Sequence, residues 1–238
     1  NTLSQAEKDA QKAAIDADVN AGKKAIDAAS DAEGIKQAVD SSNQKIDGEH
    51  KSGKSVADQK NDAKSQMDAE ANKIKAAIDA DDTLTGAEKA QQKKNVDDAN
   101  KAAQAKIDDA SNADEINNAI KDGNTNIDGQ HQSGTSVKDQ QDAAKKQLDA
   151  EADKIKQDID NDPTLSKSDK DAQKAKIDND VQAGKDAIDK QSNADDINQA
   201  ITDAKKAIDG EHVSGTPLSD QKKTAQDQLN AQAAKIKQ

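Results

Sequence analysis

The segment Leu3-Ser-Gln-Ala-Glu-Lys8 returns 81 residues later as Leu84-Thr-Gly-Ala-Glu-Lys89, and again as Leu165-Ser-Lys-Ser-Asp-Lys170. The rest of the chain keeps the same period without an insertion or deletion. A fixed period of this length is typical of an array of like modules. It predicts three repeats, residues 1–82, 83–163 and 164–238, each the size of a small domain. Positions that recur in all three repeats include Ile26, Ile107 and Ile188, then Gly48, Gly129 and Gly210, then His50, His131 and His212.

Each repeat contains three stretches whose apolar residues recur at helical spacing. In the first repeat these stretches cover about residues 5–29, 30–48 and 55–78. Steps of three and four residues place side chains on one face of a helix. The predicted core of the first repeat is Leu3, Ile15, Val19, Ile26, Ile35, Val39, Ile46, Val56, Met67, Ile74 and Ile78. At Gly22 the second repeat has Ala103, so we expect the substitution Gly22→Ala to stabilise the first repeat.

Start and stop signals flank these stretches. Ser4-x-x-Glu7 and Thr85-x-x-Glu88 have the form of a capping box, and Ser166-x-x-Asp169 is a weaker version of it. The second helix is predicted to open at Ser30, Ser111 or Ser192 and to end in a left-handed cap at Gly48, Gly129 or Gly210. The third helix is predicted to open at Ser55, at Ser136, and at Thr216 with Pro217 in its first position. Surface pairs are predicted for Asp9–Lys12, Glu70–Lys73, Glu151–Lys154 and Asp171–Lys174.

Short connections between helices make neighbouring helices antiparallel. With three helices in each module, the chain enters at one end and leaves at the other. The sequence therefore predicts an all-α fold, a tandem array of three-helix bundles stacked end to end into an elongated rod. A 25-residue helix is roughly 37 Å long, so three modules in line would reach on the order of 110–120 Å.

Composition excludes several classes of protein. The chain has no Cys and no aromatic residue, and its net charge is −12. Without Cys there is no disulfide framework, and an acidic chain is poorly suited to nucleic acid or to an anionic membrane surface. No apolar run approaches the roughly 20 residues of a membrane span. A mean hydropathy of −1.12 leaves a partly disordered polyampholyte as an alternative, although the strict register of the apolar residues favours a fold.

Two groups of residues suggest metal binding. His50, His131 and His212 follow the second helix, but one His with Asp47 or Glu49 beside it is a poor ligand set. The alternative is a loop residue that packs on the end of the bundle. Where the second repeat meets the third, Asp160, Asp162 and Thr164 alternate as in a calcium loop. That loop requires Gly at its sixth position, where this chain has Leu165, so helix capping is the simpler interpretation.

No catalytic, cofactor-binding or metal-binding residue is assigned, and no cofactor is expected. The acids lie beside Lys on predicted helix faces, and there is no Gly-rich phosphate loop between a strand and a helix. A binding module remains the main alternative, namely low-affinity, multivalent binding to a host matrix or serum protein. The residues that dominate binding hot spots, Trp, Tyr and Arg, are absent.

The pattern resembles the helical domain-of-unknown-function repeats of cell-wall-anchored surface proteins in Gram-positive bacteria, which include matrix-binding and biofilm-associated adhesins. The resemblance rests on the Leu-Thr/Ser-x-x-Glu/Asp-Lys entry of all three repeats, on Ala25-Ile-Asp27 and Ala187-Ile-Asp189, and on Ile197, Ile201 and Ile208. It implies an extracellular stalk that projects a terminal adhesive domain from the cell wall. We expect a monomer within a longer chain, whose partners are its own neighbouring repeats.

Overall fold

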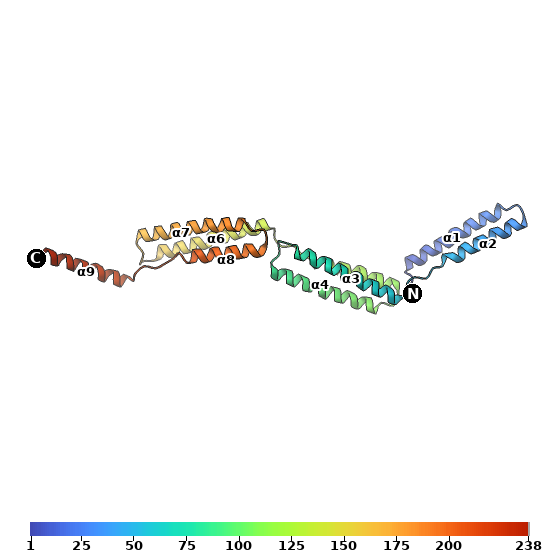
Figure 1. The fold of residues 1–238 in the computed structure, drawn as a ribbon, viewed down its shortest axis with the longest axis horizontal. Helices are drawn as coiled ribbons and strands as arrows, with labels where there is room; N and C mark the ends of the chain where they lie inside the picture. Colours follow the sequence, from blue (N-terminus) through green and yellow to red (C-terminus); the bar gives the residue numbers. More distant parts are fainter. Residues whose placement is uncertain (238) are drawn as a thin grey trace. The chain divides into compact units, whose positions relative to one another are not determined.

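The computed structural model describes residues 1–237, and these residues form helices joined by short linkers, with no strand among them (Figure 1). The all-α prediction is confirmed. The helices are α1 (Gln5–Asp27), α2 (Ala32–Glu49), α3 (Val56–Asp79), α4 (Gly86–Asp109), α5 (Ala113–Asp128), α6 (Val137–Asn161), α7 (Lys167–Asp189), α8 (Ala194–Asp209) and α9 (Leu218–Ile236).

The chain divides into two units. The first comprises Asn1–Asp79 and Ala90–Gln132, and the second comprises Ala80–Lys89 and Ser133–Gln238. These boundaries do not follow the sequence period, because helices from consecutive repeats pack together in each unit. The repeat boundaries at residues 82 and 163 stay a prediction about the sequence pattern.

In the second unit, α6, α7 and α8 pack around one core, and we call them the α6–α8 group. Helix α6 comes from the second sequence repeat, whereas α7 and α8 come from the third. Leu148 of α6 and Ile188 of α7 are fully buried. Burial of one such side chain stabilises a fold by about 1.5–3 kcal/mol. The core consists of Ala144, Leu148, Ala152, Ile155, Ile159, Ile177, Ile188, Ile197, Ile201, Ala204 and Ile208.

The first unit contains an equivalent set of helices, α3, α4 and α5, which we call the α3–α5 group. Helices α3 and α5 are in contact. Two ion pairs join α3 to α4, Lys75–Asp97 (Nζ–Oδ1, 2.8 Å) and Lys93–Asp79 (2.6 Å). The same pairs recur one period later as Lys156–Asp178 and Lys174–Asp160. In both groups, therefore, the third helix of one repeat packs on the first two helices of the next.

Helices α1 and α2 pack on each other without a third helix to cover them (Figure 1). No side chain of α2 is buried, and Gly22 is the only buried residue of α1. The first repeat thus does not enclose the core predicted for it, because its third helix, α3, contributes Met67 and Ile78 to the α3–α5 group instead. Helix α9 likewise buries no side chain.

Helices α1 and α7 begin at the capping residues that the sequence predicts. Ser4 and Ser166 form capping boxes with Glu7 and Asp169, as predicted. The amide and hydroxyl of Ser4 donate to the Glu7 carboxylate and hold the pKa of Glu7 below its ordinary value. At α4 the amide and hydroxyl of Thr85 donate to the Glu88 carboxylate in the same way, and the amide of Glu88 donates to the Thr85 hydroxyl. Ser136 caps α6 as predicted, and Ser55 accepts from the amide of Asp58 at the start of α3.

Four local predictions are wrong. The second helix of each repeat opens one residue later than predicted, at Asp31, Asn112 and Asn193, because these side chains accept from the amide three residues ahead. Gly129 and Gly210 end their helices in right-handed conformation, and no described glycine has positive φ. Pro217 precedes α9, whose cap makes no side-chain hydrogen bond. The carboxylate of Asp171 pairs with Lys167, while Lys174 reaches Asp160. The other three predicted pairs are present.

Where the first and second helices of each repeat cross, one residue of each helix faces the other. The space between them accepts a Cβ on one of these two residues only, so the other is glycine. A Cβ on Gly184 would lie 2.7 Å from the Cβ of Ala204, and a Cβ on Gly123 would lie 2.8 Å from that of Ala103. In the first repeat, a Cβ on Gly22 would lie 2.9 Å from the Cβ of Ser42. The expectation that Gly22→Ala stabilises the first repeat assumed that alanine fits at this position as it does at Ala103. That assumption is wrong. Ala103 fits only because the second repeat has a glycine opposite.

Candidate functional site: the joint between consecutive repeats

The most elaborate polar arrangement of the second unit lies where the linker between α8 and α9 meets the linker between α6 and α7. The amide of Gly215 donates to Oγ1 of Thr164 (2.7 Å), and Nε2 of Gln221 donates to the carbonyl of Thr164 (2.8 Å). A Cβ on Gly215 would lie 2.4 Å from that carbonyl oxygen. The contact therefore requires glycine because two backbones approach closely, and not because of an unusual φ.

The same contact recurs one period and two periods earlier. Gly134 donates to Oγ1 of Thr83 (2.8 Å), and Gln140 donates to the carbonyl of Thr83 (2.8 Å). In the first unit, Gln59 donates to the carbonyl of Thr2 (2.7 Å), and a Cβ on Gly53 would lie 2.2 Å from that oxygen. We call each set of a threonine, a glycine and a glutamine a joint.

Two of the joints include the start of a helix from the following repeat. In the first unit, the amide of Ala113 donates to the carbonyl of Asn1 (3.1 Å), and Asp114 accepts from the amide of Gln5 (2.9 Å). In the second unit, Ala194 donates to the carbonyl of Asp82 (3.0 Å), and Asp195 accepts from the amide of Gly86 (2.8 Å). The entry segment of one repeat is thereby held by the second helix of the next repeat.

Asp162 lies inside the third joint, where its carboxylate contacts other residues. Its Oδ1 accepts from the amide (2.8 Å) and the hydroxyl (2.6 Å) of Thr164, and its Oδ2 lies 3.1 Å from Nε2 of His212. The hydroxyl and amide of Thr164, with Ser214 and His212, hold the pKa of the Asp162 carboxyl well below its usual range. Both oxygens of this nearly buried carboxylate are therefore used within the joint.

A glutamine in the first helix of every repeat fixes the loop that leads into the joint. Gln173 donates to the carbonyl of Val213 (2.7 Å) and accepts from its amide (3.3 Å). Gln92 holds Gln132 in the same way, at 2.7 and 3.0 Å, and Gln11 holds Lys51, at 2.9 and 3.3 Å. One side-chain amide thus satisfies both backbone groups of an exposed loop residue.

The residues considered as metal ligands are in structural positions. His212 faces Asp162, as just described, and His50 is exposed directly after α2. His131 is half-buried in the equivalent loop after α5. Asp160 pairs with Lys174, and Asp162 turns to Thr164, so the two acids of the candidate calcium loop have different partners. Within residues 1–237, no three His, Cys, Asp or Glu side chains lie close enough together to hold a metal ion.

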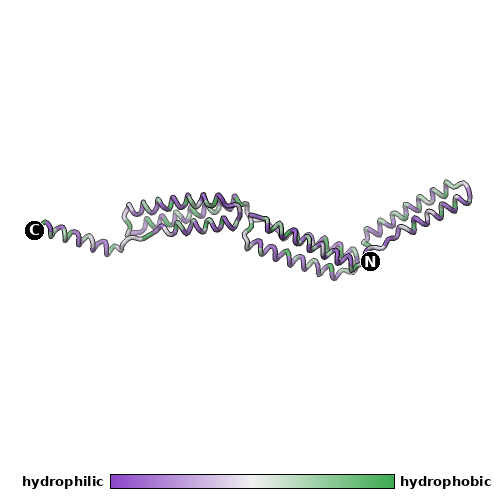
Figure 2. The backbone as a smooth tube through the Cα atoms, viewed as in Figure 1, coloured by the Kyte–Doolittle hydropathy of each residue, from purple (hydrophilic) through white to green (hydrophobic). Residues whose placement is uncertain are grey.

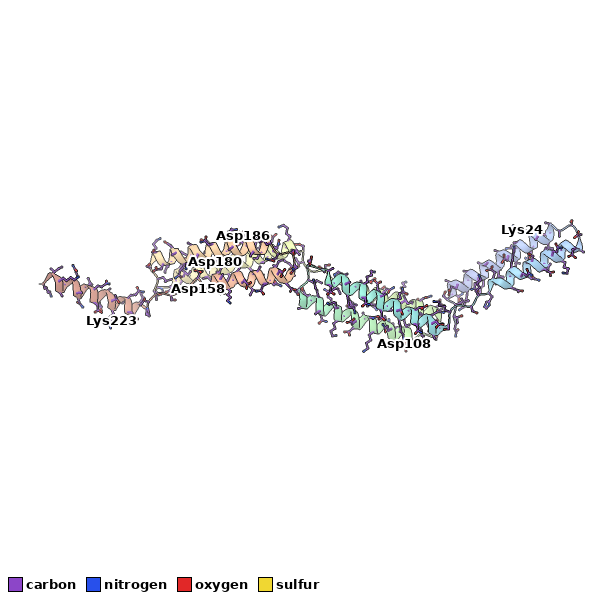
Figure 3. The ribbon with its side chains drawn as sticks, viewed as in Figure 1. Lys24, Asp108, Asp158, Asp180, Asp186 and Lys223 are labelled. Carbon is purple, nitrogen blue, oxygen red and sulfur yellow. The ribbon has the colours of Figure 1, made fainter. Side chains whose placement is uncertain are left out.

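The outer faces of the helices carry charged side chains in both units. Figure 3 labels Asp158, Asp180 and Asp186 on the α6–α8 group and Asp108 on α4, whose carboxylate pairs with Lys64 of α3. Figure 2 shows hydrophobic residues spaced singly along each helix between hydrophilic ones. None of the described helices combines the length and the apolar character that crossing a membrane requires.

Apart from Thr164, which was considered as part of a calcium loop, the joint residues were not singled out from the sequence, although a signal for them exists. Threonine, glycine and glutamine each recur unchanged with the 81-residue period, at Thr2, Thr83 and Thr164, at Gly53, Gly134 and Gly215, and at Gln59, Gln140 and Gln221. Polar residues that neither cap a helix nor belong to an apolar stripe have no local reason to recur. Their recurrence indicates a tertiary contact that every repeat makes.

Residues 140–216 match the family model described as Domain of Unknown Function (DUF1542), a domain found in Gram-positive surface proteins. The resemblance to helical domain-of-unknown-function repeats is thereby confirmed for this segment. The matched residues begin in α6 and end just before α9, so they cover the α6–α8 group and not the third sequence repeat. No curated protein and no solved structure matches the chain significantly.

Proposed function

We propose that this chain, which carries DUF1542 sequence in residues 140–216, serves as a structural spacer in a bacterial cell-surface protein. In this proposal the repeats follow one another end to end and hold a terminal functional domain away from the cell wall. The chain would act outside the cell as part of a cell-wall-anchored protein. It would carry out no catalytic step and need no cofactor.

The recurrence of the joint is the observation that carries this proposal. Each joint fixes two backbone segments to each other through a glycine, and a glutamine from the next helix adds a second hydrogen bond. Hydrogen bonds to backbone groups on both sides of a linker restrict rotation about that linker. An array in which every linker is restricted in the same way keeps its repeats in line and so spans a distance, which is what a spacer requires.

The sharing of helices between repeats supports the same proposal. Because α6 belongs to one sequence repeat and its core partners to the next, separating two repeats would expose Leu148 and Ile159 to water. A linker of Gly and Ser would leave neighbouring modules free to turn. Here a helix of 25 residues from one repeat, α6, is packed into the core of the next repeat.

Small-angle X-ray scattering on the whole chain tests the spacer proposal. Repeats in line predict a maximum dimension above roughly 110 Å, since each repeat adds about one helix length. A compact globule of the same mass would instead measure roughly 50–60 Å. A dimension in that lower range would contradict the proposal.

A glycine variant of the joint makes the test specific. In Gly134→Ala the new Cβ would lie 2.4 Å from the carbonyl oxygen of Thr83, so the joint must open. We expect unchanged helix content by circular dichroism but a scattering profile with greater flexibility. Gly48→Ala is the matched control, because a Cβ there has no atom within 4 Å. Identical profiles for both variants would show that the joint does not stiffen the chain.

A further inference from the structure

We propose that the third joint is a pH-sensitive clamp. When His212 takes up a proton opposite Asp162, the linker between α8 and α9 is held more firmly against the linker between α6 and α7. The inference goes beyond the spacer role and does not depend on it, because it concerns the strength of one contact inside the second unit. It rests on the position of histidine in the repeat, on the place of the pair in the joint and on the chemistry of the two side chains.

Histidine is confined to one position of the repeat. The three histidines of the chain are His50, His131 and His212, which are spaced by the 81-residue period. The residues on either side of them change from repeat to repeat, with Glu49, Gln130 and Glu211 before the histidine and Lys51, Gln132 and Val213 after it. An imidazole that is retained between variable neighbours indicates a contact that depends on imidazole itself.

The pair of His212 and Asp162 bridges the same two linkers as the backbone contact of the joint. Nε2 of His212 lies 3.1 Å from Oδ2 of Asp162, whose Oδ1 accepts from the amide and the hydroxyl of Thr164. Oγ1 of Thr164 in turn accepts from the amide of Gly215. A stronger attraction between His212 and Asp162 therefore pulls on the linker that contains Gly215 and on the one that contains Thr164.

The chemistry of the pair fixes which atom takes up the proton. Hydrogen bonds from Thr164, Ser214 and His212 hold the pKa of Asp162 well below its usual range, so this carboxylate is ionised at neutral and mildly acidic pH. An ionised carboxylate only accepts, so Nε2 of His212 carries a proton in this contact and Nδ1 is left to gain the second one. The ring then becomes a cation, and its hydrogen bond to Asp162 becomes charge-assisted and stronger.

Two helix ends beside the pair also favour a positive ring. Helix α6 ends at Asn161, directly before Asp162, and α8 ends at Asp209, three residues before His212. The last carbonyl groups of a helix carry partial negative charge and stabilise a cation placed near them. The side chain of His212 is 25% exposed, so water can deliver the proton.

The other charged groups around the third joint have partners of their own or are exposed. Lys176 of α7 pairs with Glu211, Lys174 and Lys170 of α7 contact Asp160, Asp169 accepts from Ser166, Asp220 accepts from Ser219, and Lys222 and Lys223 of α9 are exposed. Carboxylates and lysines ordinarily keep their charge between pH 5 and 8, whereas histidine ordinarily changes its charge in this range. Mild acidification therefore acts on the joint through His212.

The same carboxylate position is used one period earlier. Oδ1 of Asp81 accepts from the amide of Thr83 (2.9 Å), as Oδ1 of Asp162 does from that of Thr164. The histidine position of that period is filled by His131. The residues of the clamp are thus part of the repeat pattern and do not belong to one copy alone.

Amide hydrogen exchange on the whole chain tests the proposal at about pH 8 and about pH 5.5, with each rate corrected for the intrinsic effect of pH and expressed as a protection factor. The amides of Gly215 and Thr164 report the two linkers. We expect roughly fivefold greater protection of both at the lower pH, since a hydrogen bond between charged groups is stronger than one to a neutral ring. The amide of Gly34, which donates to Asp31 (2.7 Å), is the internal control and should be equally protected at both values.

Three variants show whether His212 is the source. In His212→Gln the side chain can still donate to Asp162 but cannot take up a proton, so protection near that at pH 8 should persist at pH 5.5. Asp162→Asn still accepts from Thr164 but carries no charge, and it should also lose the increase. His50→Gln is the matched control, because His50 is exposed after α2 in the first unit, and this variant should keep the increase.

The proposal would be overturned by equal or lower protection of Gly215 and Thr164 at pH 5.5 in the unchanged chain. An increase that survives in His212→Gln would overturn it as well, because the proton would then bind elsewhere. Circular dichroism checks that each variant keeps its helix content. If His212→Gln lost helix content, Asp162→Asn would decide by itself, and an increase retained in that variant would equally count against the clamp.

Discussion

The α6–α8 group and the α1–α2 pair carry nearly the same sequence pattern, yet only the first has a core. Ile197 of the group is 2% exposed, and the corresponding Ile35 of the pair is 44% exposed. Ile188 is fully buried and Ile26 is half-buried. The difference is the presence of α6, which comes from the preceding sequence repeat. An apolar stripe thus predicts that a helix packs against a partner, but its side chains are buried only where that partner is present.

The largest expected effect comes from removing a side chain that only the complete group buries. Ile197→Ala should destabilise the α6–α8 group by about 2–5 kcal/mol, because it leaves a cavity in a packed core. Ile35→Ala should cost less than about 1 kcal/mol, since the side chain is already in contact with water. Hydrogen exchange of the amides in α7 and α8, or in α1 and α2, reports each effect locally. Equal losses would contradict the proposed role of α6.

The helix crossing provides a second comparison between complete and incomplete groups. Gly184→Ala should destabilise the α6–α8 group by about 1–3 kcal/mol, because the new methyl group overlaps Ala204 and Leu148. Adding Ala204→Gly should restore most of the loss, as it recreates the arrangement of Ala103 with Gly123. Chemical denaturation of the single and double variants measures the rescue.

The same exchange in the α1–α2 pair should have a smaller effect. In Gly22→Ala the new methyl group meets only Ser42, and no third helix presses on the crossing. The two helices can therefore move apart, while alanine gains up to about 1 kcal/mol of helix propensity over glycine. A loss as large as that of Gly184→Ala would show that the pair is more constrained than its exposure indicates.

The smallest expected effect concerns the joint at Asp162. Because the folded pKa of this carboxyl lies below its unfolded value of about 3.9, its contribution to stability is present above that pH and is lost as the pH falls through the folded pKa. Asp162→Asn should therefore lower the melting temperature at pH 7, and the difference from the unchanged chain should shrink toward pH 2. Asp158→Asn, on the exposed face of α6, is the control.

A difference between Asp162→Asn and the unchanged chain that stays constant from pH 7 to pH 2 would contradict this account. The asparagine Oδ1 can still accept the hydrogen bonds of Thr164, so the pH-dependent part of the difference reports the charge of the carboxylate.

Local structure was predictable wherever one residue and its near neighbours decide it. The capping boxes at Ser4 and Thr85 and the cap at Ser136 follow from side chains that satisfy free amides within three residues. The choice between Ser30 and Asp31 as a cap was not predictable, because both are good caps and tertiary packing selects between them. The joint could have been inferred from the recurrence of Thr83, Gly134 and Gln140, but its geometry could not, because its hydrogen bonds join residues about 50 positions apart.

The sequence by itself determined the helices, the apolar face of each helix and the 81-residue period, since these depend on residue spacing and on contacts within one or two turns. Which three helices share a core was decided only in the tertiary structure. The linkers on either side of α3 are equally short, from residue 50 to 55 and from 80 to 85, so loop length favours neither neighbour. What distinguishes the two choices is long-range. Gly53 and Gly134 bring linkers against the entry segments at Thr2 and Thr83, and Ala113 and Ala194 of the following repeats donate hydrogen bonds to the same entry segments.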